Sequence, residues 1–140
     1  MFISVIETRD KISKDRHSIV ISIVREIEGS MPTISDDFMK RMMGKTKQYC
    51  IVILKPGPHR HDEGADKIIW EHGRRNFALR EEGLLSIVCP ISESTLAGVG
   101  IFNASVEEVQ TIMDEDPAVK AGVLLYETYM TRSFPGDSLP

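Results

Sequence analysis

The sequence is poor in features that mark several large classes of protein. Only two cysteines occur among its 140 residues, which rules out a disulfide scaffold. No run of about 18 apolar residues is present, so a membrane span is not expected. The net charge of −4 argues against a nucleic-acid binder, which normally has a basic surface. An ordinary apolar fraction of 41% and this length indicate one main folded domain.

Motifs for several common chemistries are missing as well. The sequence contains no glycine-rich phosphate loop, no G-x-S-x-G and no C-x-x-C. A secretory leader is not expected, because Glu7, Arg9 and Asp10 interrupt the apolar residues at the start. We therefore expect a cytoplasmic protein whose two thiols are reduced.

Charge is distributed unevenly along the chain. Residues 1–47 contain nine Lys and Arg against seven Asp and Glu, whereas residues 48–140 contain eight against fourteen. This change indicates a boundary between two parts of different character. We predict an N-terminal extension over 1–47 that serves packing or oligomerisation, an α+β domain over 48–130 and a C-terminal tail over 131–140.

Six elements are expected in the domain, in the order β-α-β-β-α-β. The apolar run at 49–54 ends at Pro56-Gly57-Pro58, which is typical of a buried strand. Ser105 and Glu108 have the spacing of a capping box at the start of the second helix. The strands are predicted at 49–54, 84–91, 99–104 and 123–129, the helices at 63–82 and 105–115, and a turn at Glu93 and Ser94.

This order predicts the ferredoxin-like α+β fold, a four-stranded antiparallel sheet with two main helices on one face. The strand at 49–54 is nevertheless apolar on both faces, with Cys50 and Val52 on one and Ile51 and Ile53 on the other. Two helices cannot cover both faces of the sheet. We therefore expect a second subunit on the uncovered face, which gives a homodimeric α+β barrel.

The extension contains no residues that suggest chemistry. Residues 19–27 are rich in β-branched side chains and fit either a helix or a strand. Ser35 is suited to cap a short helix that ends at Gly44. On the long helix of the domain, Trp70 and Phe77 fall opposite the apolar stripe, as aromatic side chains of a contact surface do. The extension is the nearest segment that would cover them, and it is the candidate for linking dimers into a higher oligomer.

A polar pair, His72 and Asn76, interrupts the apolar stripe that includes Ile69 and Leu79 on the long helix. A buried polar group needs partners, because burial without them is costly. Two interpretations stay open at this point. His72 is either a core histidine bonded to a backbone carbonyl, or it lines a pocket between helix and sheet where an imidazole serves in proton transfer.

Asp116 comes at the end of the second helix, where an acidic side chain opposes the helix dipole. One explanation is structural: Asp116, Pro117 and Gly122 have the order of N-cap, first residue and C-terminal glycine of one short helical turn. The other explanation is a carboxylate that orients a histidine or acts as a base. Both are compatible, because a carboxylate has two oxygens.

The loop before the long helix contains His59 and His61. Two histidines beside an acid can bind zinc or copper, but a solvated loop is the favoured interpretation, and we predict no metal site. Both histidines are expected at the rim of the pocket. Cys50 and Cys89 fall in strands, where cysteine usually serves as a small core residue.

Several segments of the domain form a recognisable set: YCIVILKPGP, WEHGRRNFALREEGLL around His72, the strand that ends at Pro90, and MDEDPAVKAGV around Asp116. Over about residues 48–129 the sequence resembles the YCII-related (YciI-like) family of small dimeric α+β barrel proteins. Family members commonly have Gly-Pro where this chain has Cys89-Pro90, and residues 1–47 lie outside the resemblance.

The resemblance implies a cofactor-free enzyme, a lyase, isomerase or hydrolase, that acts on a small organic or ring compound. His72 and Asp116 match the histidine and aspartate of the family pattern and would be its catalytic acid–base pair. A non-catalytic metabolite-binding dimer and a structural or interaction subunit remain as alternatives. Neither nucleic acid nor a membrane is expected as a partner. Substrate contacts are expected from Asn76, Cys89, His59 and His61.

Overall fold

The computed structural model describes residues 3–92 and 95–136 and divides the chain into two compact units. The first unit is Met1–Arg41 and the second is Met42–Pro140. The turn predicted at Glu93 and Ser94 lies outside the described residues. Within the described ranges, no helix has both the length and the apolar character that crossing a membrane requires.

The second unit is built on a four-stranded sheet in the order β2-β3-β1-β4, with antiparallel pairing throughout. This order confirms the ferredoxin-like α+β fold. One short helix is added before the last strand. The elements are β1 Lys47–Pro56, α3 Ala65–Glu81, β2 Leu85–Pro90, β3 Gly98–Phe102, α4 Val106–Asp114, α5 Pro117–Lys120 and β4 Leu124–Ser133.

The central strand β1 and the edge strand β4, which pair with each other, are longer than the apolar pattern predicts. Their ladder begins at the Lys47–Ser133 pair and continues to Pro56–Leu124. Backbone hydrogen bonds hold a ladder together whatever the side chains are, so polar residues extend both strands. Residues 131–133 are therefore strand and not part of a tail.

Local capping signals account for the helix ends. The Ser105 side chain accepts a hydrogen bond from the Glu108 backbone N–H, and the Glu108 carboxylate accepts one from Ser105, so the predicted capping box is confirmed. After α3, Gly83 adopts a positive φ of 76°, which glycine tolerates best.

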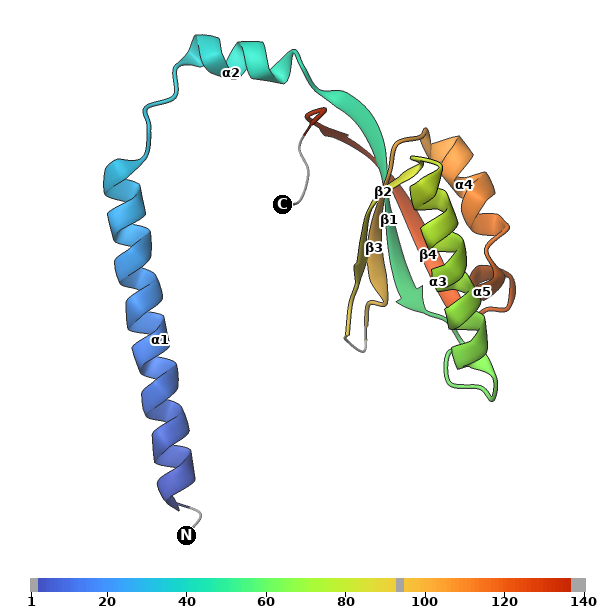
Figure 1. Cartoon of the computed structure of the whole chain (residues 1–140), viewed down its shortest axis with the longest axis horizontal. Helices are drawn as coiled ribbons and strands as arrows, with labels where there is room; N and C mark the ends of the chain where they lie inside the picture. Colours follow the sequence, from blue (N-terminus) through green and yellow to red (C-terminus); the bar gives the residue numbers. More distant parts are fainter. Residues whose placement is uncertain (1–2, 93–94, 137–140) are drawn as a thin grey trace. The chain divides into compact units, whose positions relative to one another are not determined.

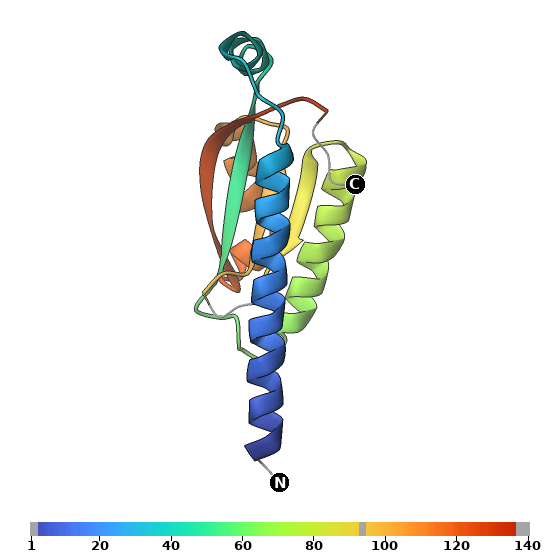
Figure 2. The same ribbon diagram turned by 90° about the vertical axis from the view of Figure 1, so that its left-hand side faces the viewer.

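Helices α3, α4 and α5 lie together on one side of the sheet (Figure 1). Figure 2 shows α3 beside β2 and α4 toward β4, in agreement with their packing contacts. The core between these layers is apolar, because one face of each strand and the inner stripe of each helix meet there. Its buried members are Cys50, Val52, Leu79, Leu85, Phe102, Val109 and Met113.

The opposite face of the sheet is also apolar. Ile51 and Ile101 are only partly buried there, and Leu125 and Tyr129 are exposed. Among the described residues of the second unit, no helix covers this face. The two-sided apolar pattern of the strands is thus present in the structure. Burial of apolar area stabilises by about 25 cal/mol per Å², so a second subunit on this face would be stabilising, and the dimer stays a prediction.

The first unit contains α1, Ile3–Ser30, and most of α2, Asp36–Met43, whose last two residues fall in the second unit. Residues 19–27 are thus helical, which decides between the two predicted conformations. The Ser35 hydroxyl accepts a hydrogen bond from the Phe38 backbone N–H and so caps α2 as predicted. The predicted cover of Trp70 and the proposed role of the extension in assembly are not tested by these features.

We predict that Ile101→Asp converts a wild-type homodimer into a monomer, because it places a charge in the centre of the uncovered sheet face. Sedimentation equilibrium at micromolar concentration measures the mass, and circular dichroism checks that the variant is folded. Thr111→Asp, on the exposed side of α4, should leave the dimer intact. A monomeric wild-type protein would contradict this prediction.

Candidate functional site

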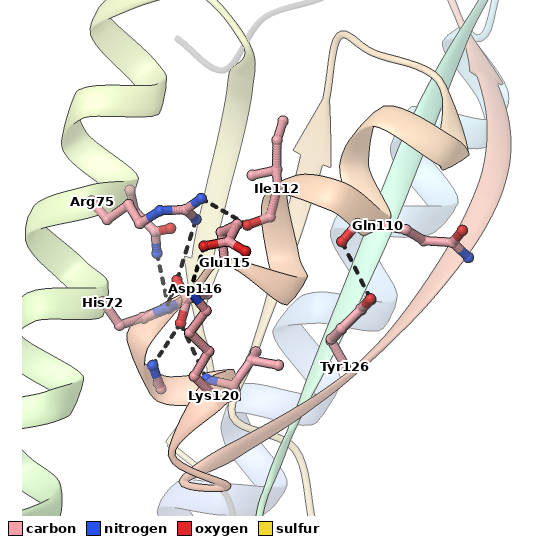
Figure 3. A network of polar contacts seen from close by, with 11 residues as sticks. His72, Arg75, Gln110, Ile112, Glu115, Asp116, Lys120 and Tyr126 are labelled. Atoms are coloured by element: carbon pink, nitrogen blue, oxygen red, sulfur yellow. Dashed lines mark hydrogen bonds and ion pairs between the residues drawn. The ribbon is translucent and has the colours of Figure 1, made fainter.

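His72 and Asp116 meet in the interior of the second unit, although they are 44 residues apart in sequence. Helix α3 carries His72, which is 8% exposed, and Asp116 precedes α5 and is fully buried. The His72 Nδ1 atom lies 2.9 Å from Asp116 Oδ2 (Figure 3). The structure therefore brings together the two residues that the sequence singled out.

Asp116 uses its two carboxylate oxygens for different purposes. Oδ1 accepts hydrogen bonds from the backbone N–H groups of Ala118, at 2.9 Å, and Val119, at 3.4 Å, and so caps α5. Pro117 occupies the first turn of this helix, as predicted. Oδ2 faces His72. One oxygen thus caps α5 and the other contacts His72, so the structural explanation is confirmed and the functional one is compatible with it.

A third charged residue, Arg75, belongs to the same group and was not identified from the sequence. Its Nη2 atom donates a hydrogen bond of 2.7 Å to the Ile112 carbonyl, and its Nη1 atom lies 3.5 Å from Asp116 Oδ2 (Figure 3). This Nη1 is buried and makes no hydrogen bond within the described residues. The available signal was its position three residues after His72, on the same helix face.

The protonation pattern of the pair follows from the state of Asp116. Burial alone raises the pKa of this carboxyl group. The hydrogen bond and charge of His72, with the backbone N–H groups of Ala118 and Val119, outweigh burial and hold the pKa below its usual 3.8. Asp116 is therefore ionised and can only accept a hydrogen bond, so His72 Nδ1 carries the proton.

Asn76 occupies the other side of the imidazole ring. Its Nδ2 atom lies 3.0 Å from His72 Nε2. In the neutral ring, Nε2 has a lone pair that accepts a hydrogen bond from this amide. One turn of α3 thus holds both the ring and the group that satisfies its second nitrogen.

A cavity of about 950 Å³ lies between α3 and the part of the sheet formed by β2 and β3. His72, Asn76 and Phe77 line it, and the remaining wall is mostly apolar. A Cβ atom added at Gly73 would meet nothing within 4 Å, so this glycine faces open space. Phe77 borders the cavity and is nevertheless 71% exposed, as is Trp70, so both aromatic side chains are exposed as predicted. Their role in a contact surface stays a prediction.

The two histidines of the loop before α3 have different surroundings. His61 lines the cavity, whereas His59 does not. The His59 Nδ1 atom lies 2.7 Å from Asp62 Oδ2, and its ring packs against Gly122. The structure therefore supports a rim position for His61 alone. Within the described residues, no group of three or more His, Cys, Asp or Glu side chains is arranged to hold a metal ion.

Cys89 lies along the cavity wall in β2. Its neighbour Val88 packs against the core on the helix side of the sheet. Because side chains alternate along a strand, the Cys89 thiol is directed to the opposite face. Cys50, by contrast, is a buried core residue, as predicted.

We predict that Asp116→Asn lowers the free energy of unfolding at pH 7 by about 3–5 kcal/mol, because it removes one partner of a buried charge pair. Asparagine retains an acceptor for the α5 cap, so the effect isolates the charge. Urea denaturation measures it, and Asp66→Asn, at an exposed site, serves as the control. Equal stability of Asp116→Asn and the wild type would contradict this prediction.

The same carboxylate predicts a dependence of stability on pH. Its pKa is lowered in the folded state, so its contribution is present above the unfolded pKa and is lost as the pH falls through the folded pKa. The wild type should therefore lose stability below about pH 4. Asp116→Asn should lose less over that range, which urea denaturation at pH 5 and pH 3 compares directly.

A further prediction concerns the open space at Gly73. Gly73→Ala should raise the free energy of unfolding by about 0.5–1 kcal/mol, because alanine favours the helix and its methyl group meets no atom. Thermal denaturation measures the change. Destabilisation by this variant would show that the wall at Gly73 is closed.

Several solved structures are similar to this chain. A solved structure of 5-chloro-2-hydroxyhydroquinone dehydrochlorinase from Burkholderia phenoliruptrix AC1100, in complex with 2,5-dihydroxybenzoquinone, is similar over 63% of this chain and 95% of its own. The TM-score is 0.44 and the sequence identity is 18%. No protein-family model and no curated protein matches the chain. The resemblance to the YCII-related family therefore stays a prediction.

Proposed function

We propose that this protein is an enzyme that moves a proton on a small organic or ring compound, with His72 as the acid–base group. The observation that carries the proposal is the buried pair of His72 and Asp116 on the wall of a 950 Å³ cavity. Sites for small molecules are usually apolar cavities of this size with a few polar groups that converge. A buried histidine outside such a cavity would have only a structural role.

The proton transfer occurs at Nε2 of His72, the ring nitrogen that is not bonded to Asp116. Its lone pair takes a proton from the substrate, and the ring becomes an imidazolium. In an isomerisation the same proton returns to another atom of the substrate. In an elimination the electron pair left on the substrate expels a leaving group, and the proton is released afterwards. Both routes balance with no external oxidant or reductant.

Asp116 and Arg75 set the charge around the ring. The Asp116 carboxylate accepts the Nδ1–H bond, fixes the tautomer and stabilises the imidazolium as it forms. The Arg75 guanidinium, 3.5 Å away, already balances part of the carboxylate charge. Asp116 is therefore not left as an uncompensated buried charge.

The substrate must displace the Asn76 amide from the Nε2 atom of His72 before that atom can react. The amide bonds to the Nε2 atom that reacts, and the Asn76 side chain lies on the cavity wall. After proton transfer, a half-turn of the amide presents its oxygen to the new N–H. Asn76 therefore satisfies the ring in both charge states, once before and once after the reaction.

We also propose that the protein acts in the cytoplasm and without a cofactor. Proton transfer by a histidine requires no cofactor, and both cysteines are free, as is usual in a reducing compartment. The catalytic domain acts as a homodimer through its uncovered sheet face, with the extension as the candidate link to a higher oligomer. The proposal names neither nucleic acid nor a membrane as a partner.

We predict that His72→Gln lowers turnover by about 10²–10⁴-fold, the usual contribution of a general acid–base group. Small ring lactones, haloaromatic compounds and thioesters form the substrate panel, and chromatography of the products measures turnover. His17→Gln, in α1, is the matched control and should retain full activity. Thermal denaturation shows whether the His72 variant is folded.

Two results would overturn the proposal. Turnover that is unchanged in a folded His72→Gln variant would show that another group moves the proton. Tight binding of panel compounds by the wild type, with no conversion of any, would instead support a metabolite-binding dimer that uses the same cavity.

A further inference from the structure

The charged side chains on the cavity wall share one sign. They are Arg60 and Arg80, and no aspartate or glutamate lines the cavity among the described residues. The chain as a whole is acidic, with 21 Asp and Glu against 17 Lys and Arg. A basic cavity in an acidic protein is therefore a local feature, and it favours ligands with negative charge.

The two arginines differ in how their charge is balanced. Arg60 Nη1 forms an ion pair of 3.1 Å with Asp66 Oδ1. The Arg80 side chain makes no hydrogen bond or ion pair with any residue in the part of the chain that the structure describes. Its guanidinium is thus the cation on this wall whose charge remains available to a ligand.

Arg80 also lies in line with the reacting group. Asn76 follows His72 by four residues, and Arg80 follows Asn76 by four more, so the three lie along one side of α3. The His72 and Arg80 backbones are separated by about 12 Å along the helix, at 1.5 Å per residue. Side chains on a helix lean toward its N-terminus, and the arginine side chain is longer than that of histidine, so the guanidinium can extend back toward the imidazole and shorten this span. The space left between the guanidinium and the imidazole suits a ligand with a single ring.

The wall opposite this interval is apolar. Leu85, Val88 and Phe102 line the cavity there, and Gly100 of β3 contributes no side chain. A flat apolar ring would be surrounded by these groups and by Phe77. A planar anionic substituent would match the two parallel N–H bonds that a guanidinium offers.

We infer that the substrate is an organic carboxylate with a small apolar ring, whose carboxylate binds Arg80 while the ring presents its reacting atom to His72. This inference rests on the proposed function, because it takes the cavity as the substrate site. It assigns Arg80 to binding, a role that sequence analysis did not give to any arginine.

The test compares matched pairs of acid and amide: benzoate with benzamide, and 4-hydroxybenzoate with 4-hydroxybenzamide. Ligand-observed NMR measures binding to the full-length protein. The wild type should bind each carboxylate at least tenfold more tightly than its amide. Arg80→Met should abolish this preference, because it removes the charge and keeps a similar stem.

Two control variants make the result specific. Arg74→Met removes the same charge six residues earlier on α3, at a residue that does not line the cavity, and should keep the preference. Gly73→Leu extends a side chain into the open space and should weaken binding of acid and amide alike. Thermal denaturation confirms that each variant is folded.

The possible outcomes separate this inference from the proposed function. If acid and amide bind equally, or if none of the carboxylates binds, the inference about the anion is wrong, and turnover of neutral compounds by His72 is still to be decided by its own test. Carboxylate binding that Gly73→Leu leaves unchanged would place the ligand outside the cavity, and the proposed site would fail with the inference.

Discussion

The negative charge of Asp116 is the constraint on which the centre of this domain depends. A fully buried carboxylate is tolerated only when other groups replace its lost hydration. Here the replacements come from the backbone of α5, the imidazole of His72 and the guanidinium of Arg75. Helices α3 and α5 must therefore both be in place before the charge of Asp116 has its hydrogen-bond and ion-pair partners. The carboxylate to which we assign a role in proton transfer is therefore also one that the fold needs.

Much of the fold could be predicted because its signals are local. The Ser105 and Glu108 spacing indicated a helix start, and the apolar residues on both sides of Cys50 indicated a central strand. Strand ends were less well predicted, because the Lys47–Ser133 pairing depends on a partner strand far along the chain. The start of α3 was misplaced by two residues, since Gly64 has a positive φ and no side-chain cap marks this end.

The candidate site was predictable in part for the same reason. His72 and Asp116 each contradicted a local rule, one by polarity within an apolar stripe and the other by its sign at a helix end. Arg75 contradicted no rule, because an arginine on a helix is usually solvated. The Arg75 side chain turns inward because the C-terminal end of α4 lies close by and the Ile112 carbonyl accepts its hydrogen bond. Likewise, the loop path alone decides that His61 and not His59 reaches the cavity.

The glycines of the cavity wall differ in how freely they can be replaced. At Gly100 a Cβ would come within 3.3 Å of Leu85 and 3.4 Å of Phe102, so a side chain there would press on the core. At Gly73 there is no such neighbour. Related sequences can therefore change the shape of the cavity at position 73 with little effect on stability, whereas position 100 in β3 has little freedom to vary. If the cavity binds a substrate, its size can be adjusted from α3, the helix that contains His72.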